Sequence, residues 1–499
     1  MTWIILATIT LIFLLPYLFQ QWLLKTKPLC NKLPPGPKGF PIIGSLHLLG
    51  KLIHKDLHYL SQIYGPIMHI QLGLLPAIIV SSARATELFL KTHDLHFASR
   101  PLTITSNHIS YGRKGIVFAQ YGPYWRNIRK MCTLELLSSL KINSFSSMRK
   151  QEVGSLIKGL EDAATDGVAV DLTSKISSVI GDMICVMVLG RKYEDNELGE
   201  KGFKGLIREA TQLAAAPNLG DFIPLIARFD VQGFGGRAKA VGKIFDGFLE
   251  SIVEEHVVFE KDNKDKDFVD VLLDLMGSRE YQIDRSNIKA IILDFVIAAV
   301  DSTTTTINWM LSELIKHPHI MKKLQEELEK VVGLNRMVEE SDLSNLKYLE
   351  MVMKESLRMH PPVPLIPREC IQDCNINGYH IPKKSRIVIN AWAIGRDPNT
   401  WVDPHKFDPE RFLESEVDVR GRDFELIPFG SGRRGCVGIQ LALVVVRLVV
   451  AQLLHCFDLK LPDGMSPLEL DMTEILGLTC PRAQNLRVIP IFRLCPNYL

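Results

Sequence analysis

The pattern of apolar and charged residues divides the chain into a short leading segment and a long body. No charged side chain occurs in residues 1–24. A helix over residues 3–24 would be about 33 Å long at roughly 1.5 Å per residue, which is enough to cross a hydrocarbon core of roughly 30 Å. The pattern therefore predicts an uncleaved membrane anchor at 1–24. The alternative is a cleaved signal peptide, which normally has a basic start and a small-residue cleavage site.

Residues 25–45 form a basic, proline-rich segment. Its lysines follow the apolar run directly, and such residues hold the downstream chain on the cytosolic side of a membrane. Pro34, Pro35, Pro37 and Pro41 cannot propagate a helix. The sequence therefore predicts a stiff, extended hinge between the anchor and the body.

Beyond residue 45, apolar residues recur mainly at helical spacing. In residues 321–332 they return every three or four positions, and residues 291–300 are apolar enough for a long buried helix. The charged run at 260–267 is typical of a solvated loop. Shorter strand-like runs occur at 67–72, 77–80 and 386–389. We expect residues 46–499 to form one catalytic domain of the mainly α class with a minor β sheet (α+β).

The composition is that of an ordinary globular protein. Of 499 residues, 46% are hydrophobic and 23% are charged, and 58 Lys and Arg against 56 Asp and Glu leave a formal net charge of +2. These values exclude a disordered chain and a small disulfide scaffold, and they give no reason to expect a nucleic acid as partner. The cysteines include no C-x-x-C pair. Cys370 and Cys374 resemble half of a metal site, but no second pair accompanies them.

A glycine-rich segment at 428–438 carries the most specific chemistry. It contains G-x-G-x-x-G at Gly430, Gly432 and Gly435, which is the fingerprint of a dinucleotide site, although no ordinary βαβ pattern surrounds it. The alternative is that the glycines let the backbone pass close to a flat ligand whose iron is bound by Cys436. Backbone N–H groups and the start of the following helix would stabilise the thiolate. Electron donation from that thiolate favours cleavage of the O–O bond.

At this segment the chain resembles the cytochrome P450 family, in particular its microsomal plant type. The family pattern F-x-x-G-x-R-x-C-x-G is matched by Phe429, Gly432, Arg434, Cys436 and Gly438. Three further family motifs occur in the family order: W-x-x-x-R at 125–129, E-x-x-R at 355–358 and P-E-R-F at 409–412. With the apolar amino terminus and the hinge, the resemblance spans essentially the whole chain and implies the cytochrome P450 fold.

The resemblance implies a haem b cofactor with Cys436 as the axial ligand of its iron. The residues implied to bind the cofactor are Trp125, Arg129, Arg368, Phe429, Gly432, Arg434, Cys436 and Gly438. Glu355 and Arg358 are neighbours on one helix face. Together with Arg411 they are implied to form a buried structural network, where an isolated pair would be an ordinary surface ion pair.

Residues 298–303 resemble the family's oxygen-activation motif A-G-x-D-T-T, with Ala299 in place of glycine and Ser302 in place of threonine. The resemblance implies that Asp301 and Ser302 are catalytic and supply protons during dioxygen activation. A serine hydroxyl donates and accepts as a threonine hydroxyl does, but it lacks the β-methyl group that restricts the side chain. The alternative is that the hydroxyl only bonds a carbonyl of its own helix. The implied substrate contacts are Ile297, Ala298, Val363, Leu365, Ile366 and Leu478.

These resemblances imply a haem-thiolate monooxygenase. The expected reaction inserts one oxygen atom from O2 into a lipophilic plant specialised metabolite, aromatic (phenylpropanoid-type) or terpenoid, with hydroxylation as the expected outcome. Electrons would come from NADPH through NADPH-cytochrome reductase. The anchor would hold the catalytic domain on the cytosolic face of the endoplasmic reticulum membrane. The alternatives are a membrane-anchored haem sensor or carrier without turnover, and an NADP-dependent dehydrogenase that uses the 430–435 run.

Overall fold

The computed structural model describes residues 14, 32–193, 202–258 and 266–495. The predicted anchor at 1–24, apart from residue 14, lies outside the described residues, as do the first part of the hinge and most of the charged run at 260–267. Within the described chain, three helices are long and apolar enough to cross a membrane, namely Leu172–Leu189, Arg285–Lys316 and Ile439–Cys456. More than half of the apolar window of each (56%, 61% and 72%) is buried inside the molecule, so these helices form its core.

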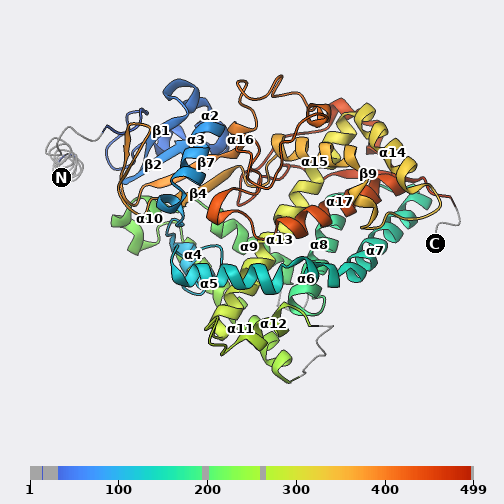
Figure 1. The fold of residues 1–499 in the computed structure, drawn as a ribbon, viewed down its shortest axis with the longest axis horizontal. Helices are drawn as coiled ribbons and strands as arrows, with labels where there is room; N and C mark the ends of the chain where they lie inside the picture. Colours follow the sequence, from blue (N-terminus) through green and yellow to red (C-terminus); the bar gives the residue numbers. More distant parts are fainter. Residues whose placement is uncertain (1–13, 15–31, 194–201, 259–265, 496–499) are drawn as a thin grey trace, which may run out of the picture.

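Most of the described chain is helical, as the apolar periodicity predicts (Figure 1). The helices are α2 (Ile53–Tyr64), α3 (Ala83–Glu87), α4 (Ile104–Ile109), α5 (Pro123–Met131), α6 (Ser139–Ser144), α7 (Ser146–Thr165), α8 (Leu172–Leu189), α9 (Gly202–Ala215), α10 (Leu219–Phe222), α11 (Phe234–Val258), α12 (Phe268–Leu275), α13 (Arg285–Lys316), α14 (Pro318–Val332), α15 (Lys347–Met359), α16 (Ala391–Ile394) and α17 (Ile439–Cys456). The predicted helix at 321–332 lies within α14, and the predicted buried helix at 291–300 lies within α13.

The described strands form small sheets beside the helices. They are β1 (Ile67–Leu72), β2 (Leu75–Val80), β3 (Val170–Asp171), β4 (Leu365–Glu369), β5 (Cys374–Ile376), β6 (Tyr379–Ile381), β7 (Arg386–Asn390), β8 (Phe457–Lys460) and β9 (Arg487–Phe492). A four-stranded sheet has the order β1-β2-β7-β4, a second sheet has the order β3-β9-β8, and β5 pairs with β6. All three predicted strands are confirmed, as β1, β2 and β7. In the four-stranded sheet only the β2–β7 pair is parallel.

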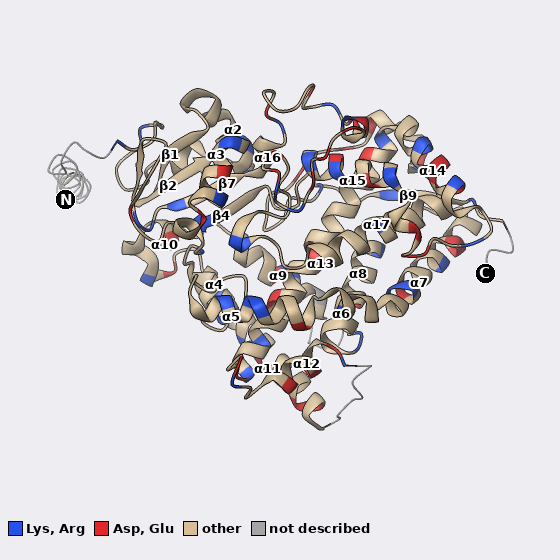
Figure 2. Ribbon diagram, viewed as in Figure 1, with Lys and Arg blue, Asp and Glu red and all other residues tan. Residues whose placement is uncertain are grey.

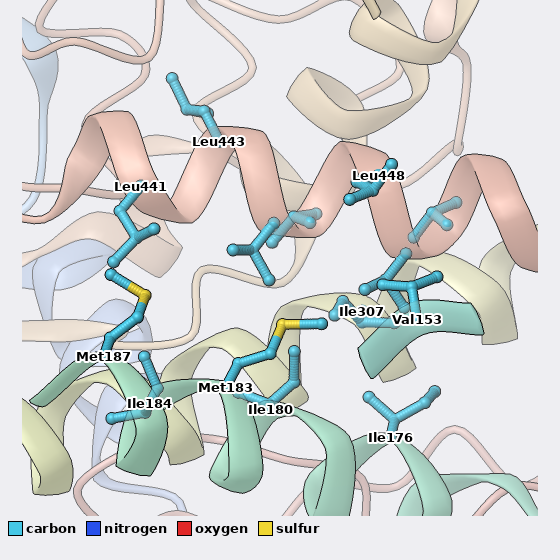
Figure 3. Close-up of a cluster of buried hydrophobic side chains, with 14 of the residues drawn as sticks. Val153, Ile176, Ile180, Met183, Ile184, Met187, Ile307, Leu441, Leu443 and Leu448 are labelled. Atoms are coloured by element: carbon cyan, nitrogen blue, oxygen red, sulfur yellow. The ribbon is translucent and has the colours of Figure 1, made fainter. Parts of the chain in front are cut away.

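The main core lies where α8, α13 and α17 pack together. Helix α17 carries almost no charged residues in Figure 2, and Figure 3 shows Met187 of α8 and Leu441 of α17 pointing toward one another. The long helix α13 begins where the Asp284 carboxylate accepts the Asn287 N–H at 2.9 Å, and it ends before Pro318. A proline has no N–H and disfavours helical backbone in the residue before it, so α13 and α14 are separate helices.

Candidate functional site

The loop that carries Cys436 is fixed immediately before α17. The Cys436 N–H donates to the Phe429 carbonyl at 2.9 Å, which closes the loop. Gly432 has a φ of 67°, and a Cβ at this position would lie 2.4 Å from the Leu90 carbonyl oxygen and 2.8 Å from Asp94 Oδ1. Only glycine fits both the left-handed backbone and this close approach. The residues before the loop, 421–430, are turns and coil, so the strand that a dinucleotide fingerprint requires is not there.

The Cys436 side chain is accessible in the folded chain. Burial among the surrounding residues nevertheless raises the pKa of the thiol. The backbone N–H of Gly438 and the charge of Arg129 oppose this shift and favour the thiolate. The net shift of the pKa is upward, so the free thiol is neutral, and a metal ion bound to this sulfur would displace its proton. The Gly438 N–H and Arg129 would then stabilise the resulting thiolate.

Four arginines gather together, namely Arg100, Arg129, Arg368 and Arg434, and one of them, Arg129, acts on the Cys436 thiol. Burial lowers the pKa of Arg100 to about 10 and that of Arg434 to about 9. Arg368 is completely buried, and burial together with the charges of Arg100 and Arg434 holds its pKa well below the ordinary value. Its Nε and Nη2 atoms have no hydrogen-bond partner among the described residues. Like charges with unpaired donors at this depth require an anionic ligand.

Trp125 and Arg434 form a wall of this site. Arg434 donates from Nε to the Ala98 carbonyl at 2.7 Å, from Nη1 to the Ile116 carbonyl at 3.3 Å and from Nη2 to the Ala119 carbonyl. Trp125 Nε1 also donates to Ile116, at 2.9 Å, and the Arg434 guanidinium lies 4.0 Å from the indole ring centre. The described bonds of these two side chains therefore organise the backbone beside the cluster. Arg368, by contrast, donates only from Nη1, to the Pro367 carbonyl at 3.0 Å, and its Nε and Nη2 donors stay unpaired.

Helix α13 has an accessible stretch at the predicted oxygen-activation motif. Residues 288–294 and 303–315 are buried, whereas Ala298 between them is exposed and Ile297 and residues 299–302 are half-buried. Several of these residues pack on the same core cluster as Phe429, Val437 and Ile439 from the cysteine side. Apolar surface left open between buried stretches of one helix marks a ligand site.

Asp301 has a partner that the sequence did not indicate. The Thr479 hydroxyl donates to Asp301 Oδ2 at 2.5 Å, and Thr479 itself is buried. The Ser302 hydroxyl donates to the Ala298 carbonyl at 2.7 Å, one turn earlier in the same helix. A hydrogen bond from Thr479, which is distant in the sequence, thus holds the Asp301 carboxylate in place. The Ser302 hydroxyl makes the bond to a carbonyl of its own helix that the sequence analysis named as an alternative.

We expect Thr479→Val to lower the product formed per NADPH consumed by up to about tenfold. A hydrogen bond to a charged group contributes roughly 1.5–3 kcal/mol, and without it the Asp301 carboxylate can turn away from the reacting centre. Thr479→Ser keeps the hydroxyl and should restore coupling. Product and NADPH measured side by side test this, and equal coupling in Val and Ser variants would contradict it.

The structure brings the predicted network together: Glu355 and Arg358 lie on α15, and Arg411 reaches them from the short helical turn Pro409–Phe412. Arg358 donates from Nε and Nη2 to the two Glu355 carboxylate oxygens at 2.7 and 2.8 Å, and Arg411 Nε donates to the same carboxylate at 3.1 Å. Glu355 and Arg358 are fully buried. Arg358 Nη1 also donates to the Gly395 carbonyl, so the network ties α15 to the segment around α16.

Two of the expected substrate contacts, Leu365 and Ile366, lie on opposite faces of strand β4. Successive side chains of a strand point to opposite faces, so Ile366 shares the face of Arg368 while Leu365 lies on the other face. Leu365 packs on the cluster built around α2, β1 and β2. Leu365 therefore lies on the face away from Arg368, and its expected contact with substrate stays a prediction. Val363 and Leu478 are half-buried, as a lining residue should be.

A second group of possible metal ligands already has its carboxylate charge paired by neighbouring side chains. His54, Glu474 and Cys480 bring their ligand atoms within 4.8 Å of one another. His54 Nε2 and Lys55 Nζ contact the Glu474 carboxylate at 2.9 and 2.6 Å, however, and these contacts hold the pKa of Glu474 at about 2. Burial raises the pKa of the Cys480 thiol, so the neutral form is favoured there.

Asp294 of α13 is an unexpected buried acid. Its carboxylate accepts the Val117 N–H at 2.9 Å and also bonds the Ile116 N–H, which ties α13 to the segment that bonds Trp125 and Arg434. Burial raises its pKa from the ordinary 3.8 to about 7. The folded chain therefore keeps a proton that the unfolded chain has released, and the stability from this proton is complete below pH 3.8 and is lost as the pH rises through about 7.

The free energy of unfolding of the parent should decrease as the pH rises from about 5 to about 8, and we expect this decrease to be smaller in Asp294→Asn. At about pH 8 the variant should be about 1–3 kcal/mol more stable than the parent. Denaturant titrations across this range measure both slopes. The exposed Asp166→Asn serves as the control and should retain the parent slope. Parallel slopes for parent and Asp294→Asn would refute the assignment.

Known proteins resemble the chain over nearly its full length. The family model described as Cytochrome P450 matches residues 34–486. The chain is 51% identical to "Cytochrome P450 CYP736A12" of Panax ginseng, covering 93% of this chain and 94% of that protein. It is 41% identical to "Flavonoid 3'-monooxygenase" of Arabidopsis thaliana (94% and 93%) and 40% identical to "Flavonoid 3'-monooxygenase CYP75B137" of Crocosmia x crocosmiiflora (93% of each). The mainly helical structure with minor sheets is the fold of this family. The chain therefore belongs to the cytochrome P450 family of plant monooxygenases, which are oxidoreductases that incorporate oxygen from O2.

Proposed function

We propose that this chain binds haem b with the Cys436 thiolate as axial ligand and inserts one oxygen atom from O2 into a lipophilic plant specialised metabolite. The observation that carries the proposal is the buried Arg368 guanidinium, whose unpaired nitrogen atoms lie among three other arginines, one of which, Arg129, acts on the accessible thiol. The residues fit an iron porphyrin, because such a group needs a thiolate for the metal and cations for its carboxylates.

When bound, a thiolate-ligated haem supplies the activation of O2. The chain's own residues would perform the supporting steps. Arg100, Arg129 and Arg368 would neutralise the carboxylates, and the Gly438 N–H would stabilise the thiolate. Asp301, held by Thr479, and Ser302 would deliver protons toward the reacting oxygen. To do so, the Ser302 hydroxyl must exchange its bond to the Ala298 carbonyl for one directed outward.

The substrate would lie against apolar side chains. We assign its contacts to Ile297, Ala298, Val363, Ile366 and Leu478, which are apolar and, except for the buried Ile366, at least partly exposed. A lining of this kind favours a lipophilic molecule over a charged one. The two relatives described as flavonoid 3'-monooxygenases support an aromatic, phenylpropanoid-type substrate and a hydroxylation, with a terpenoid as the alternative.

The proposed reaction also requires a source of electrons, and the chain must be placed where that source can reach it. We propose that NADPH-cytochrome reductase supplies the electrons from NADPH, and that residues 1–24 anchor the protein in the endoplasmic reticulum membrane. The hinge at 25–45 would then hold the catalytic domain, residues 46–499, on the cytosolic side. The apolar run followed by lysines in the sequence supports this arrangement.

Turnover of a panel of lipophilic compounds in isotopically labelled O2 tests the proposal. Membranes that contain the full chain, haem, the reductase and NADPH should yield a product with one labelled oxygen atom. Membranes without the reductase are the control and should yield none. Product that carries oxygen from water, or that forms without NADPH, would overturn the proposal.

Arg368→Met separates the ligand role of Arg368 from a structural role. In the haem-free protein, loss of an unpaired buried charge should raise the free energy of unfolding by about 1–3 kcal/mol. Haem affinity should fall by at least about tenfold, because a carboxylate loses its partner. Thermal unfolding of haem-free protein and haem titration measure the two effects. The exposed Arg126→Met should alter neither, and a haem-free Arg368→Met less stable than its parent would contradict this role.

A further inference from the structure

Two cysteines that the proposed function does not use lie together at the end of β4. Cys370 directly follows this strand, Cys374 begins β5, and their Sγ atoms are 4.0 Å apart. A disulfide requires a separation of about 2.05 Å. Each sulfur therefore needs to move by roughly 1 Å, which a small rotation about the Cα–Cβ bond provides.

The backbone on both sides of this pair is held in place. The Cys370 N–H donates to the Ser385 carbonyl at 3.0 Å, and the Cys370 carbonyl accepts the Lys384 N–H at 2.8 Å. Cys374 is paired with Ile381 in the β5–β6 hairpin. Because the sheet fixes both main-chain positions, the two sulfurs lie close together in the folded chain. The Cys370 thiol also donates to the Gln372 carbonyl at 3.0 Å, a bond that closing the disulfide would break.

The two thiols differ in accessibility and in acidity. Cys370 is buried, while Cys374 is half-buried and can be reached from solvent. The hydrogen bond between them lowers the pKa of Cys374 and raises that of Cys370. Cys374 is thus suited to react first as a thiolate, with Cys370 behind it to complete a disulfide.

We propose that Cys370 and Cys374 are a reversible oxidation site that closes to an intramolecular disulfide when hydrogen peroxide reaches it. The Cys374 thiolate attacks one peroxide oxygen, the O–O bond breaks, and a sulfenic acid and one water form after protonation. The Cys370 sulfur then attacks the Cys374 sulfur, and its proton leaves with the hydroxyl as a second water. Two thiols lose two electrons in total, and one peroxide is reduced to two waters.

The site is connected to the proposed haem pocket by a single strand. Arg368 lies two residues before Cys370 at the end of β4. A disulfide would link the end of β4 covalently to β5. Oxidation would therefore restrain the strand that carries Arg368. In a reducing compartment thiol reductants would reopen the bond, which is the behaviour of a redox-sensing disulfide.

Peptide mapping of the full haem-containing chain tests the proposal. Cleavage by trypsin after Arg368 and Lys383 places both cysteines in the peptide 369–383. After a brief peroxide treatment and alkylation, we expect this peptide without alkyl groups and lighter by two hydrogens. Dithiothreitol before alkylation should restore two alkyl groups. Cys374→Ser should leave Cys370 alkylated, and the exposed Cys495 should be alkylated in every sample that contains the parent residue.

The rate of disulfide formation shows whether the fold brings the two cysteines together, or whether they react only because they are near one another in the sequence. The disulfide should form at least about tenfold faster in the folded chain than in urea, because the sheet holds the sulfurs together only when folded. Equal rates in both states would overturn the proposal, as would a peptide 369–383 that keeps two alkyl groups after peroxide or carries an irreversibly oxidised sulfur in place of the disulfide.

Discussion

Cys436→Ser should abolish product formation, with a loss of more than about a hundredfold, and should remove the carbon monoxide difference spectrum typical of a thiolate-ligated haem. A serine hydroxyl is similar in size, but it neither ionises readily at neutral pH nor donates electron density as a thiolate does. The reduced, carbon monoxide-bound spectrum of membranes and the turnover of a lipophilic substrate measure the two losses independently.

A second cysteine provides the control for this substitution. Cys495 is also exposed, and it lies close to the end of the described chain. Cys495→Ser should retain both the spectrum and the turnover. A Cys436→Ser protein that keeps a thiolate-type spectrum would assign the axial ligand to another residue and would remove the basis of the proposed function.

Glu355→Gln should destabilise the folded chain by about 3–5 kcal/mol. The substitution keeps the shape of the side chain but removes the counter-charge of Arg358, a guanidinium that is fully buried. An unpaired buried charge is costly, whereas an exposed pair contributes at most about 1 kcal/mol. Urea titration of the haem-containing protein and of its variant, at one haem concentration, gives the difference in unfolding free energy.

The pair of Lys150 and Glu339 is the matched control. It is an ion pair of similar length, 2.8 Å, with side chains that are 68% and 52% exposed. Glu339→Gln should cost less than about 1 kcal/mol. If the two glutamine variants lose similar free energy, the three-residue network on α15 does not stabilise the fold as proposed.

The sequence supported those parts of the site that lie within one short segment. The loop around Cys436 is prepared by nearby residues, since Gly432 permits the turn and Gly438 offers its N–H to the sulfur. Glu355 and Arg358 are three residues apart on one helix, so their contact also follows from local spacing. No pattern in the sequence distinguishes Leu365 from Ile366. Only the sheet shows that Ile366 shares the face of Arg368, while Leu365 packs on the cluster around α2, β1 and β2.

Other partners could not be found by local pattern. Thr479 meets Asp301 across a separation of 178 residues. Arg100 comes from a segment far from Arg368 and Arg434, and no motif in the sequence indicates that it joins them. Asp294 likewise gave no signal, since an isolated acid in an apolar run does not indicate which backbone N–H groups it will bond.

The sequence by itself determined the mainly helical class and the strands at β1, β2 and β7, and its motifs single out Cys436 as the sulfur proposed to bind iron. These features depend on side-chain periodicity and on motifs whose residues are close in the chain. The tertiary structure alone decided that Arg100 joins Arg129, Arg368 and Arg434, what holds the Asp301 carboxylate, and that Cys370 and Cys374 lie close together. The reason is that charge burial and hydrogen-bond partners arise only when packing removes water and brings distant segments together.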